Sequence, residues 1–312
     1  MIQVTNLTKY YGKRLAVDDI SFNVGKGEIV GFLGPNAAGK TTTMRILTGF
    51  LAPTRGDVKV AGYDVLTHSL DARRHIGYLP EAIPLYTDMT IRGYLEFLAR
   101  LRGLPADRVK SRVDDVVELC HLEEYFDVLI SKLSKGFRQR VGVAQAIVHE
   151  PDVLILDEPT IGIDPIQIAS TRQLIRELGK EHTVLISTHI LPEVSMVCER
   201  VIIINEGKII AEDRIENLSS LVSGYRRVRL EVQGPTKKIA ERLRQIKGVT
   251  RVSYQDSNFI VEYPAGLDLR SKITEAVVQS GFTLLSLESV EMSLEDIFLK
   301  LTTEEETEET GQ

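Results

Sequence analysis

Residues 34–42 read Gly34-Pro35-Asn36-Ala37-Ala38-Gly39-Lys40-Thr41-Thr42, and the chain is organised around this stretch. The apolar run 29–33 precedes it and the helix-like segment 43–47 follows it. A buried strand thus leads through a glycine-rich turn to a helix N-terminus, where free N–H groups and the helix dipole hold phosphate. The spacing Gly-x4-Gly-Lys-Thr places the Lys40 ammonium near the β and γ phosphates of a nucleotide and the Thr41 hydroxyl within reach of Mg²⁺.

The composition is that of an ordinary globular protein of about two domains, with 312 residues, 43% of them apolar and 26% charged. The formal charge is −6, but five glutamates lie between residues 304 and 309, so the remainder carries only −1. Proteins that bind nucleic acid gather basic charge for the phosphates, so we expect no nucleic-acid partner. The acidic tail 302–312 is expected to be disordered.

Two cysteines, Cys120 and Cys198, lie in apolar segments without metal-ligand spacing, which predicts buried, reduced thiols and a reducing compartment. The first six residues contain neither a basic nor an apolar leader segment. No run approaches the roughly 18 to 20 apolar residues that span a bilayer. We therefore expect a cytoplasmic chain that crosses no membrane itself.

The N-terminal region alternates apolar and polar residues as strands do. Ile2, Val4 and Leu7 form one such pattern, 20–24 follows the turn-like pair Asp18-Asp19, and 56–62 forms another. These segments predict a small antiparallel sheet beside the phosphate loop. Tyr11 lies in this region and is either a half-buried strand residue or an aromatic ring that stacks on a nucleotide base.

A mostly helical insertion of about sixty residues, 87–149, interrupts the α/β pattern. A strand end at 76–81 precedes it, and Glu81 there is either a solvated carboxylate or a metal ligand. Inside the insertion, Ser134 stands at an N-cap position before the apolar run 141–148. Gly136 belongs to the same helix start, which is the second place in the chain suited to hold an anion.

Two apolar runs of the type found in strands buried on both faces end in polar residues. The run 153–156 ends in Asp157-Glu158, and 183–188 ends in His189. Ligands of open α/β sheets bind at such carboxyl ends, and Mg²⁺ is a natural partner for a buried Asp157. A helix-capping pair and a structural histidine are the ordinary alternatives. Helices are predicted at 167–181 and 191–198, and a β-hairpin at 201–210.

The C-terminal part follows a small-residue stretch at 219–224. Its pattern predicts strand 228–232, helix 236–246, strands 249–254 and 258–263, helix 269–279 and strand 283–290. This order is that of a ferredoxin-like βαββαβ unit. A short docking helix is predicted at 292–298.

Together these segments resemble the ATP-binding subunit of ATP-binding cassette (ABC) transporters over residues 1–216. Six motifs of the family occur here in the family's order. Residues 34–42 resemble the Walker A motif, Glu81 stands at the Q-loop position, and residues 133–140 match the signature motif. Residues 153–158 match the Walker B motif, residues 162–164 match the D-loop, and His189 is at the position of the H-loop histidine. The resemblance implies an α/β P-loop NTPase core with a mixed sheet, an antiparallel β subdomain and a helical insertion. The expected domains are a nucleotide-binding domain, 1–218, and a ferredoxin-like accessory domain, 224–301.

The resemblance also implies ATP and Mg²⁺ as cofactors and assigns roles by position. Lys40 and the N–H groups of 34–42 hold the phosphates, and Thr41, Asp157 and Glu81 surround the metal. Glu158 orients the attacking water, His189 contacts the γ phosphate, and Tyr11 stacks on adenine. Ser134 and Gly136 act on the nucleotide of a second copy, because the ATPases of this family pair head to tail.

Two positions depart from the family pattern. Ala37 stands where Gly is common, and a positive φ there costs on the order of 1 kcal/mol. Glu81 stands where Gln is usual, which adds negative charge beside the γ phosphate; Glu also occurs in export-type relatives.

Residues 77–81 and the domain 224–301 are similar to those of ABC-2-type export ATPases, including multidrug-type and gliding-motility-associated members. This similarity implies a separate polytopic permease, contacted near 83–89, and a location on the inner face of the cytoplasmic membrane. The alternative function is a soluble ABC-type ATPase that acts on nucleic acid or ribosomes; the second cassette or basic insertion typical of that class is not found in this sequence. The accessory domain is either a spacer or dimerisation module or a site for a regulatory ligand.

Overall fold

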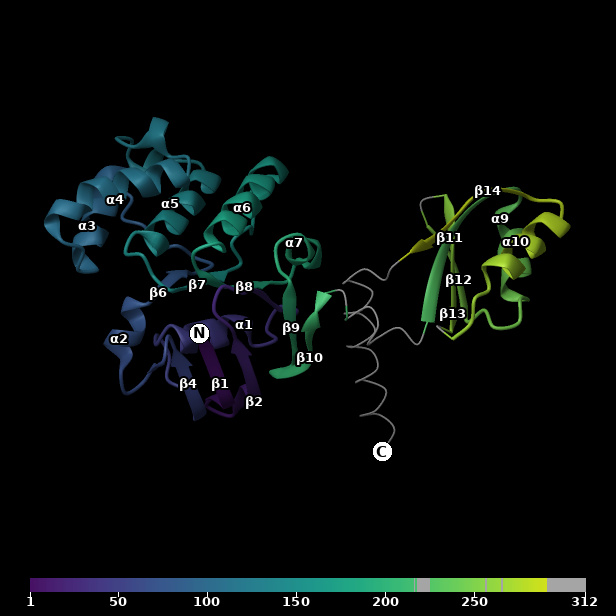
Figure 1. Ribbon diagram of the computed structural model, residues 1–312, viewed down its shortest axis with the longest axis horizontal. Coiled ribbons are helices and arrows are strands. Elements are labelled where there is room, and N and C mark those ends of the chain that lie inside the picture. The colour runs from purple at the N-terminus through teal and green to yellow at the C-terminus, as the bar shows by residue number, and fades with distance from the viewer. Residues whose placement is uncertain (216, 218–224, 256, 265, 291–312) are drawn as a thin grey trace. The chain divides into compact units, whose positions relative to one another are not determined.

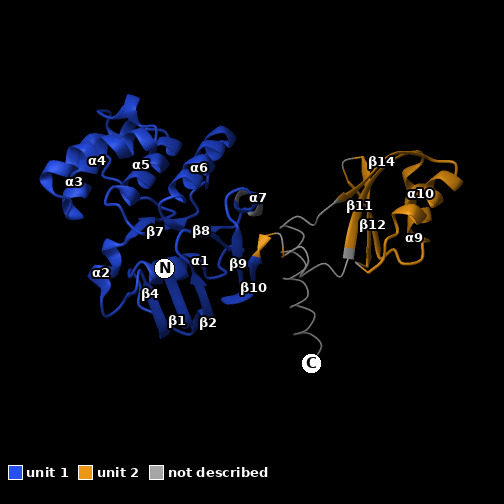
Figure 2. Ribbon diagram, viewed as in Figure 1, with its two compact units in different colours: residues 1–213 blue, residues 214–312 orange. Residues whose placement is uncertain are grey.

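The computed structural model describes residues 1–215, 217, 225–255, 257–264 and 266–290. The chain divides into two compact units, 1–213 and 214–312, which we treat separately (Figure 2). The predicted boundary at 219–224, the helix at 292–298 and the acidic tail lie outside the described residues. Among the described helices, none has the length and apolar character that a membrane span requires.

Unit 1 contains two sheets and a group of helices (Figure 1). Its strands are β1 (Ile2–Tyr11), β2 (Arg14–Val24), β3 (Ile29–Leu33), β4 (Arg55–Val60), β5 (Tyr63–Asp64), β6 (Ile76–Leu79), β7 (Val153–Asp157), β8 (Thr183–Thr188), β9 (Arg200–Asn205) and β10 (Lys208–Arg214). Its helices are α1 (Lys40–Leu47), α2 (Ser69–Arg74), α3 (Ile91–Leu101), α4 (Ala106–Leu119), η1 (Glu123–Tyr125), η2 (Ile130–Lys132), α5 (Lys135–Ile147), α6 (Pro165–Leu178) and α7 (Leu191–Ser195).

The central sheet has the order β10-β9-β3-β8-β7-β6, and the pairs from β9 to β6 are parallel. Every residue of β7 and β8 is buried, as the apolar runs 153–156 and 184–186 within them predict. A core that includes Val30, Phe32 and Met44 lies between this sheet, α1 and the antiparallel sheet. The carboxyl ends of β3, β7 and β8 consequently meet at one edge, where the candidate site lies.

The antiparallel sheet has the order β2-β1-β4-β5 and confirms the sheet predicted beside the phosphate loop. The turn predicted at Asp18-Asp19 was wrong, because both residues lie within β2. Asp19 adopts a φ of 51° opposite an irregularity in β1, and Asn6 Nδ2 donates to Asp19 Oδ1 at 3.0 Å. A β-bulge inside a strand therefore produced the turn-like signal.

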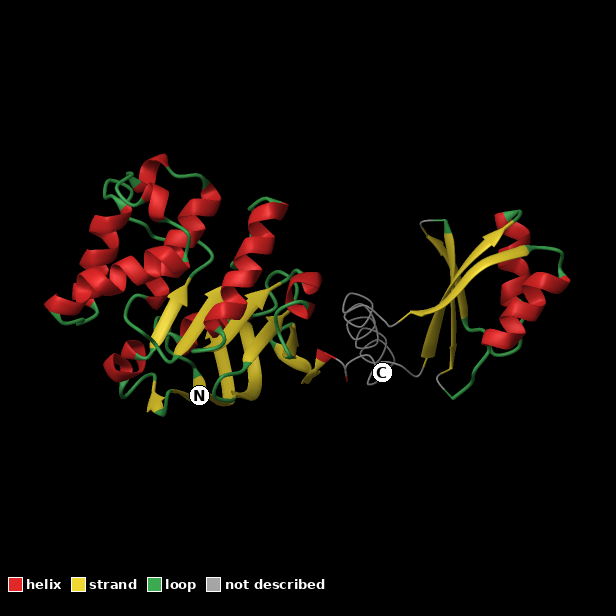
Figure 3. Ribbon diagram, turned by 45° about the horizontal axis from the view of Figure 1, so that its top comes forward, coloured by secondary structure: helices red, strands yellow, loops and turns green. Residues whose placement is uncertain are grey.

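The insertion is helical as predicted, and Figure 3 shows its helices α3, α4 and α5 gathered to one side of the sheets of unit 1. Helix α3 begins after Thr90, whose Oγ1 accepts from the Gly93 N–H at 3.1 Å. Helix α6 begins at Pro165, two residues before the predicted start, because Asp164 caps it. Helix α7 ends at Ser195, before the predicted end at 198. Cys120 and Cys198 are buried free thiols, as expected.

Unit 2 contains β11 (Tyr225–Gln233), α9 (Thr236–Arg244), β12 (Arg251–Gln255), β13 (Asn258–Pro264), α10 (Arg270–Gln279) and β14 (Thr283–Val290). The antiparallel sheet has the order β12-β13-β11-β14, and its core includes Leu230, Phe259 and Ile273. The element order and the strand order are those of a ferredoxin-like unit, in agreement with the sequence pattern.

Candidate active site

The phosphate loop connects buried β3 to α1 in a conformation that depends on small residues. A Cβ on Gly34 would lie 2.3 Å from the Ile204 carbonyl oxygen, and one on Gly39 would lie 2.6 Å from that of Ala16. Gly39 is the N-cap of α1 with a φ of 109°, and no side chain caps the helix. The N–H groups of the first turn are thus left for an anion, as the sequence predicts.

Ala37 adopts a φ of 68°, the left-handed conformation in which an alanine is strained. The expected cost of about 1 kcal/mol therefore applies to this chain. The loop keeps its conformation because the flanking residues Ala38 and Gly39 are buried.

Lys40 is the first residue of α1, and its side chain is 6% exposed. Its Nζ donates to the carbonyl oxygens of Gly34 at 2.8 Å and Pro35 at 3.1 Å. It also lies 3.4 Å from Glu158 Oε1. The ammonium is thus held inside the loop that is expected to receive phosphate.

Asp157 is the last residue of β7 and is fully buried. Its Oδ1 accepts from Ser187 Oγ at 2.5 Å and from Thr41 Oγ1 at 3.4 Å, whereas no described residue pairs with its buried Oδ2. Burial raises the pKa of this carboxyl, although the two hydroxyl donors oppose the shift. An unpaired carboxylate oxygen beside a threonine hydroxyl fits a hard cation with oxygen ligands.

Among the described residues, no three His, Cys, Asp or Glu side chains converge to hold a metal. This agrees with Mg²⁺, which proteins hold through one or two side chains while waters and substrate phosphates complete its coordination. Thr41 and Asp157 would hold the ion; Thr41 and Glu81 both line the pocket described below, whereas Asp157 is not part of its lining.

Glu158 follows Asp157 in the left-handed conformation, with a φ of 51°. Its N–H donates to the Ser187 carbonyl oxygen at 2.9 Å, which fixes the backbone. Its Oε2 lies 2.9 Å from His189 Nδ1, and its side chain is 6% exposed. Lys40, Glu158 and His189 therefore form a connected chain of polar groups at the carboxyl edge of the sheet.

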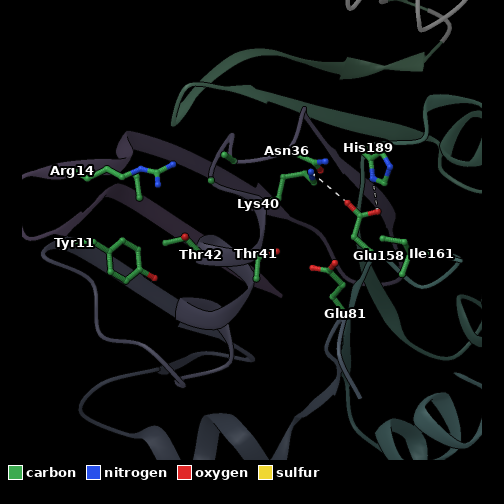
Figure 4. A pocket seen from close by; sticks show the side chains of 13 residues that line it. Tyr11, Arg14, Asn36, Lys40, Thr41, Thr42, Glu81, Glu158, Ile161 and His189 are labelled. Carbon is green, nitrogen blue, oxygen red and sulfur yellow. Dashed lines mark hydrogen bonds and ion pairs between the residues drawn. The ribbon is translucent and has the colours of Figure 1, made fainter. Parts of the chain in front are cut away.

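A pocket of about 510 Å³ opens above these groups. Figure 4 shows Tyr11 and Arg14 at one end of it and Glu158 and His189 at the other, with Lys40 and Thr41 between them. Its lining consists of Tyr11, Arg14, Ala16, Asn36, Ala37, Gly39, Lys40, Thr41, Thr42, Glu81, Glu158, Ile161 and His189. The volume is in the range of small-molecule sites, roughly 300 to 1,000 Å³.

Ser134 and Gly136 do not line this pocket, although the structure confirms the helix start predicted for them. Ser134 Oγ accepts from the Phe137 N–H at 3.4 Å at the start of α5. Gly34, Pro35 and Ala38 belong to the loop but not to the pocket lining. Most of the predicted site residues therefore line one pocket, but Ser134 and Gly136 at the start of α5 do not.

Four residues of the site were not predicted from the sequence: Arg14, Ala16, Ile161 and Ser187. Ser187 contacts Asp157 because β7 and β8 pair with these two residues in register. Ser187 could have been predicted as a site residue, because it stands two residues before His189 at the end of an apolar run. Arg14 is the cross-strand partner of Tyr11, which places both at the same end of the pocket.

Comparison with known proteins agrees with this geometry. The ABC transporter family model matches residues 17–161. The bacitracin transport ATP-binding protein of Bacillus licheniformis is 37% identical over 303 residues, 96% of this chain and 97% of that protein. Nod factor export ATP-binding protein I of Ralstonia nicotianae is 34% identical over 315 residues, 97% and 94% of the two chains.

Among solved structures, a dimeric bacterial ABC transporter cassette superposes with a TM-score of 0.63 at 25% identity, covering 69% of this chain and 99% of that one. The relatives align with nearly the whole chain, and the superposed cassette spans most of it. The chain therefore belongs to the ATP-binding proteins of the ABC transporter family.

Proposed function

We propose that this chain binds ATP with Mg²⁺ and hydrolyses it to drive a separate membrane-spanning export subunit. The observation that carries the proposal is the pocket that unites Lys40, Thr41, Glu158 and His189 with Tyr11 at its far end. Its relatives named for bacitracin transport and Nod factor export support transport as the process that is driven.

Each side chain has a physical task in this proposal. Lys40 leaves the Gly34 and Pro35 carbonyl oxygens and pairs with the β and γ phosphates, and the N–H groups at the start of α1 donate to the same oxygens. Tyr11, 45% exposed, stacks on the adenine ring.

Thr41 and Asp157 would hold Mg²⁺, which would supply positive charge to neutralise the β and γ phosphates. Glu158 accepts a hydrogen bond from the attacking water and orients it toward the γ phosphate. His189 holds the Glu158 carboxylate through its Nδ1 and contacts the γ phosphate. Positioning and electrostatic stabilisation by such groups account for most of the rate in phosphoryl transfer.

A second copy completes the site in this proposal. Ser134 and Gly136 do not line the pocket of their own chain, and a head-to-tail pair would bring them to the nucleotide of the partner. The similar bacterial cassette that is dimeric supports this arrangement.

The permease contact is placed at 83–89, between β6 and α3. Tyr86 is 52% exposed there, and its ring also contacts those of Tyr94 and Phe97. The aromatic group is thus both packed on α3 and available on the surface. Through this contact the chain would lie at the inner face of the cytoplasmic membrane, as in ABC-2-type exporters.

Glu158→Gln tests the hydrolytic proposal. We expect the variant to bind ATP, form a stable dimer detected by light scattering, and release phosphate at least about 100-fold more slowly, because a neutral amide orients and polarises the attacking water less well than the carboxylate does. Glu150→Gln, which changes an exposed glutamate paired with Arg108, is the matched control and is expected to keep wild-type turnover. Undiminished phosphate release by Glu158→Gln would overturn the mechanism.

A further inference from the structure

The first turn of α5 lies directly against the start of α6 of the same chain. A Cβ on Gly136 would lie only 1.7 Å from Gln167 Oε1 and 2.3 Å from its Cδ, so the carboxamide of Gln167 rests on Gly136. One turn further along, Arg140 Nη2 donates to Ser170 Oγ at 2.9 Å. The Lys135 ammonium packs in the same way against Gly162, where a Cβ would lie 2.1 Å from Nζ.

These contacts bury Gly136, although its neighbours Ser134 and Lys135 are exposed. The cover over Gly136 is therefore local, and Gln167 provides it. A carboxamide oxygen is also a hydrogen-bond acceptor, as a phosphate oxygen is. Gln167 thus occupies the surface that the nucleotide of a partner would need.

The backbone of Gln167 is fixed, so only its side chain can leave. Asp164 Oδ1 accepts from the N–H groups of Ile166 at 3.1 Å and Gln167 at 3.0 Å and caps α6. Gln167 is half-buried, and no hydrogen bond from its carboxamide to the described residues accompanies the packing on Gly136. A side-chain rotation is therefore sufficient to uncover α5 without unwinding α6.

We propose that Gln167 is an intramolecular cover on the start of α5, which must rotate away before Ser134 and Gly136 can receive the γ phosphate held by a second copy. This inference rests on the proposed function, because it concerns the regulation of the same composite site. In a single chain the covered state predominates, so that ATP-driven pairing requires more ATP than it would if α5 were open. An equilibrium that leaves only a fraction of chains competent weakens apparent affinity by that fraction.

The cover itself is tested in the nucleotide-free chain by hydrogen–deuterium exchange. Gln167→Ala is expected to speed exchange of the amides in the peptide that contains residues 134–139. Gln173→Ala is the matched control on the same helix, since Gln173 is exposed and bonds only to Glu177 in the described contacts. Unchanged exchange in Gln167→Ala would show that Gln167 does not cover α5.

The consequence is tested in the Glu158→Gln background, where the dimer accumulates. Adding Gln167→Ala is expected to lower the ATP concentration at the midpoint of dimerisation by about threefold or more, whereas Gln173→Ala leaves it unchanged. An unchanged or higher midpoint with Gln167→Ala would overturn the inference. If the Glu158→Gln parent never dimerises, the proposed function fails, and hydrogen exchange still decides whether the cover exists.

Discussion

The two ends of the central sheet differ in how far their charged side chains are buried. At the carboxyl end, Asp157, Glu158 and Lys40 are each at most 6% exposed, and one oxygen of Asp157 has no partner among the described residues. At the amino end, the carboxylate of Asp152 stays 48% exposed and pairs with His75 at 2.5 Å. The same strands, β6 to β8, therefore bury charge at one end and expose it at the other.

The polar side chains that are buried or half-buried at the amino end include Thr183, His182 and His149, and each has a hydrogen-bond partner. His182 Nδ1 is hydrogen-bonded to the Pro151 carbonyl oxygen at 2.6 Å. Burial and the neighbouring Arg102 lower the pKa of His149 to about 4. Among the described residues of unit 1, the buried Lys, Asp and Glu side chains thus gather at the carboxyl edge of the sheet, where an external cation or phosphate can balance them, whereas the buried Glu262 of unit 2 is paired with Arg227.

Asp157→Asn tests the buried charge at the carboxyl end of the sheet. We expect the affinity for ATP to lose its dependence on Mg²⁺, a change on the order of 100-fold, because a neutral amide replaces the carboxylate ligand. At the same time, the nucleotide-free protein should melt at a higher temperature at neutral pH. Isothermal calorimetry with and without Mg²⁺ and thermal denaturation measure the two effects.

The sign of the stability effect follows from the raised pKa of Asp157. A carboxyl whose pKa is higher in the folded than in the unfolded state costs stability as the pH rises through the folded value. The wild-type protein should therefore lose part of its stability with rising pH, and Asp157→Asn should not show this component. A variant with lower stability and retained Mg²⁺ dependence would contradict the assigned role.

His149→Gln tests the opposite end of the sheet. The folded protein resists protonation of His149 down to a pKa of about 4, whereas the unfolded chain takes up the proton near its ordinary value of 6.5. Stability is therefore lost as the pH falls from about 6.5 toward 4, and between pH 7 and pH 5 this group contributes about 2 kcal/mol of that loss.

Urea unfolding at pH 7 and pH 5 measures how steeply the free energy of unfolding changes with pH. His149→Gln should flatten this dependence, while its side-chain N–H can still donate to the Ile76 carbonyl oxygen that His149 Nε2 contacts at 3.0 Å. His121→Gln, at an exposed position, controls for the loss of one titratable group. An identical slope in His149→Gln and wild type would show that folding does not lower the pKa of His149.

The sequence predicted those parts of the site that depend on local patterns. The phosphate loop, the strand end that carries Asp157 and Glu158, and the helix start at Ser134 are each specified by residues close together in the chain. The turn predicted at Asp18-Asp19 failed because a β-bulge and a turn favour the same residues. Only the pairing of β1 with β2 distinguishes the two.

The contacts that could not be predicted join residues far apart in the chain. Ser187 lies beside Asp157 through the register of β7 and β8, and Gln167 covers Gly136 through the packing of α6 on α5. Periodicity assigns residues to strands and helices but does not fix register or helix packing. The sequence therefore predicted Asp157 and Gly136 as site residues, but it did not predict Ser187 and Gln167, the side chains that contact them.

Ser187→Ala tests the comparison within a single strand, because β8 has side-chain hydroxyl groups that form hydrogen bonds at both of its ends. At the carboxyl end, Ser187 Oγ donates to Asp157 Oδ1; near the amino end, Thr183 Oγ1 accepts from the Gly27 N–H at 3.0 Å. Removing the Ser187 hydroxyl should weaken Mg²⁺-dependent nucleotide binding about tenfold, since Asp157 loses the donor that orients it. Calorimetric titration of ATP at a series of Mg²⁺ concentrations measures this change.

Thr183→Val provides the matched control, with a hydroxyl lost from the other end of the same buried strand. It should lower the free energy of unfolding by about 1 kcal/mol and leave the Mg²⁺ dependence unchanged. Ser187→Thr keeps the hydroxyl and should recover most of the Mg²⁺ affinity that Ser187→Ala loses. If Ser187→Ala and Thr183→Val differed only in stability, Ser187 would be a structural residue, and orientation of Asp157 would have to come from Thr41 alone.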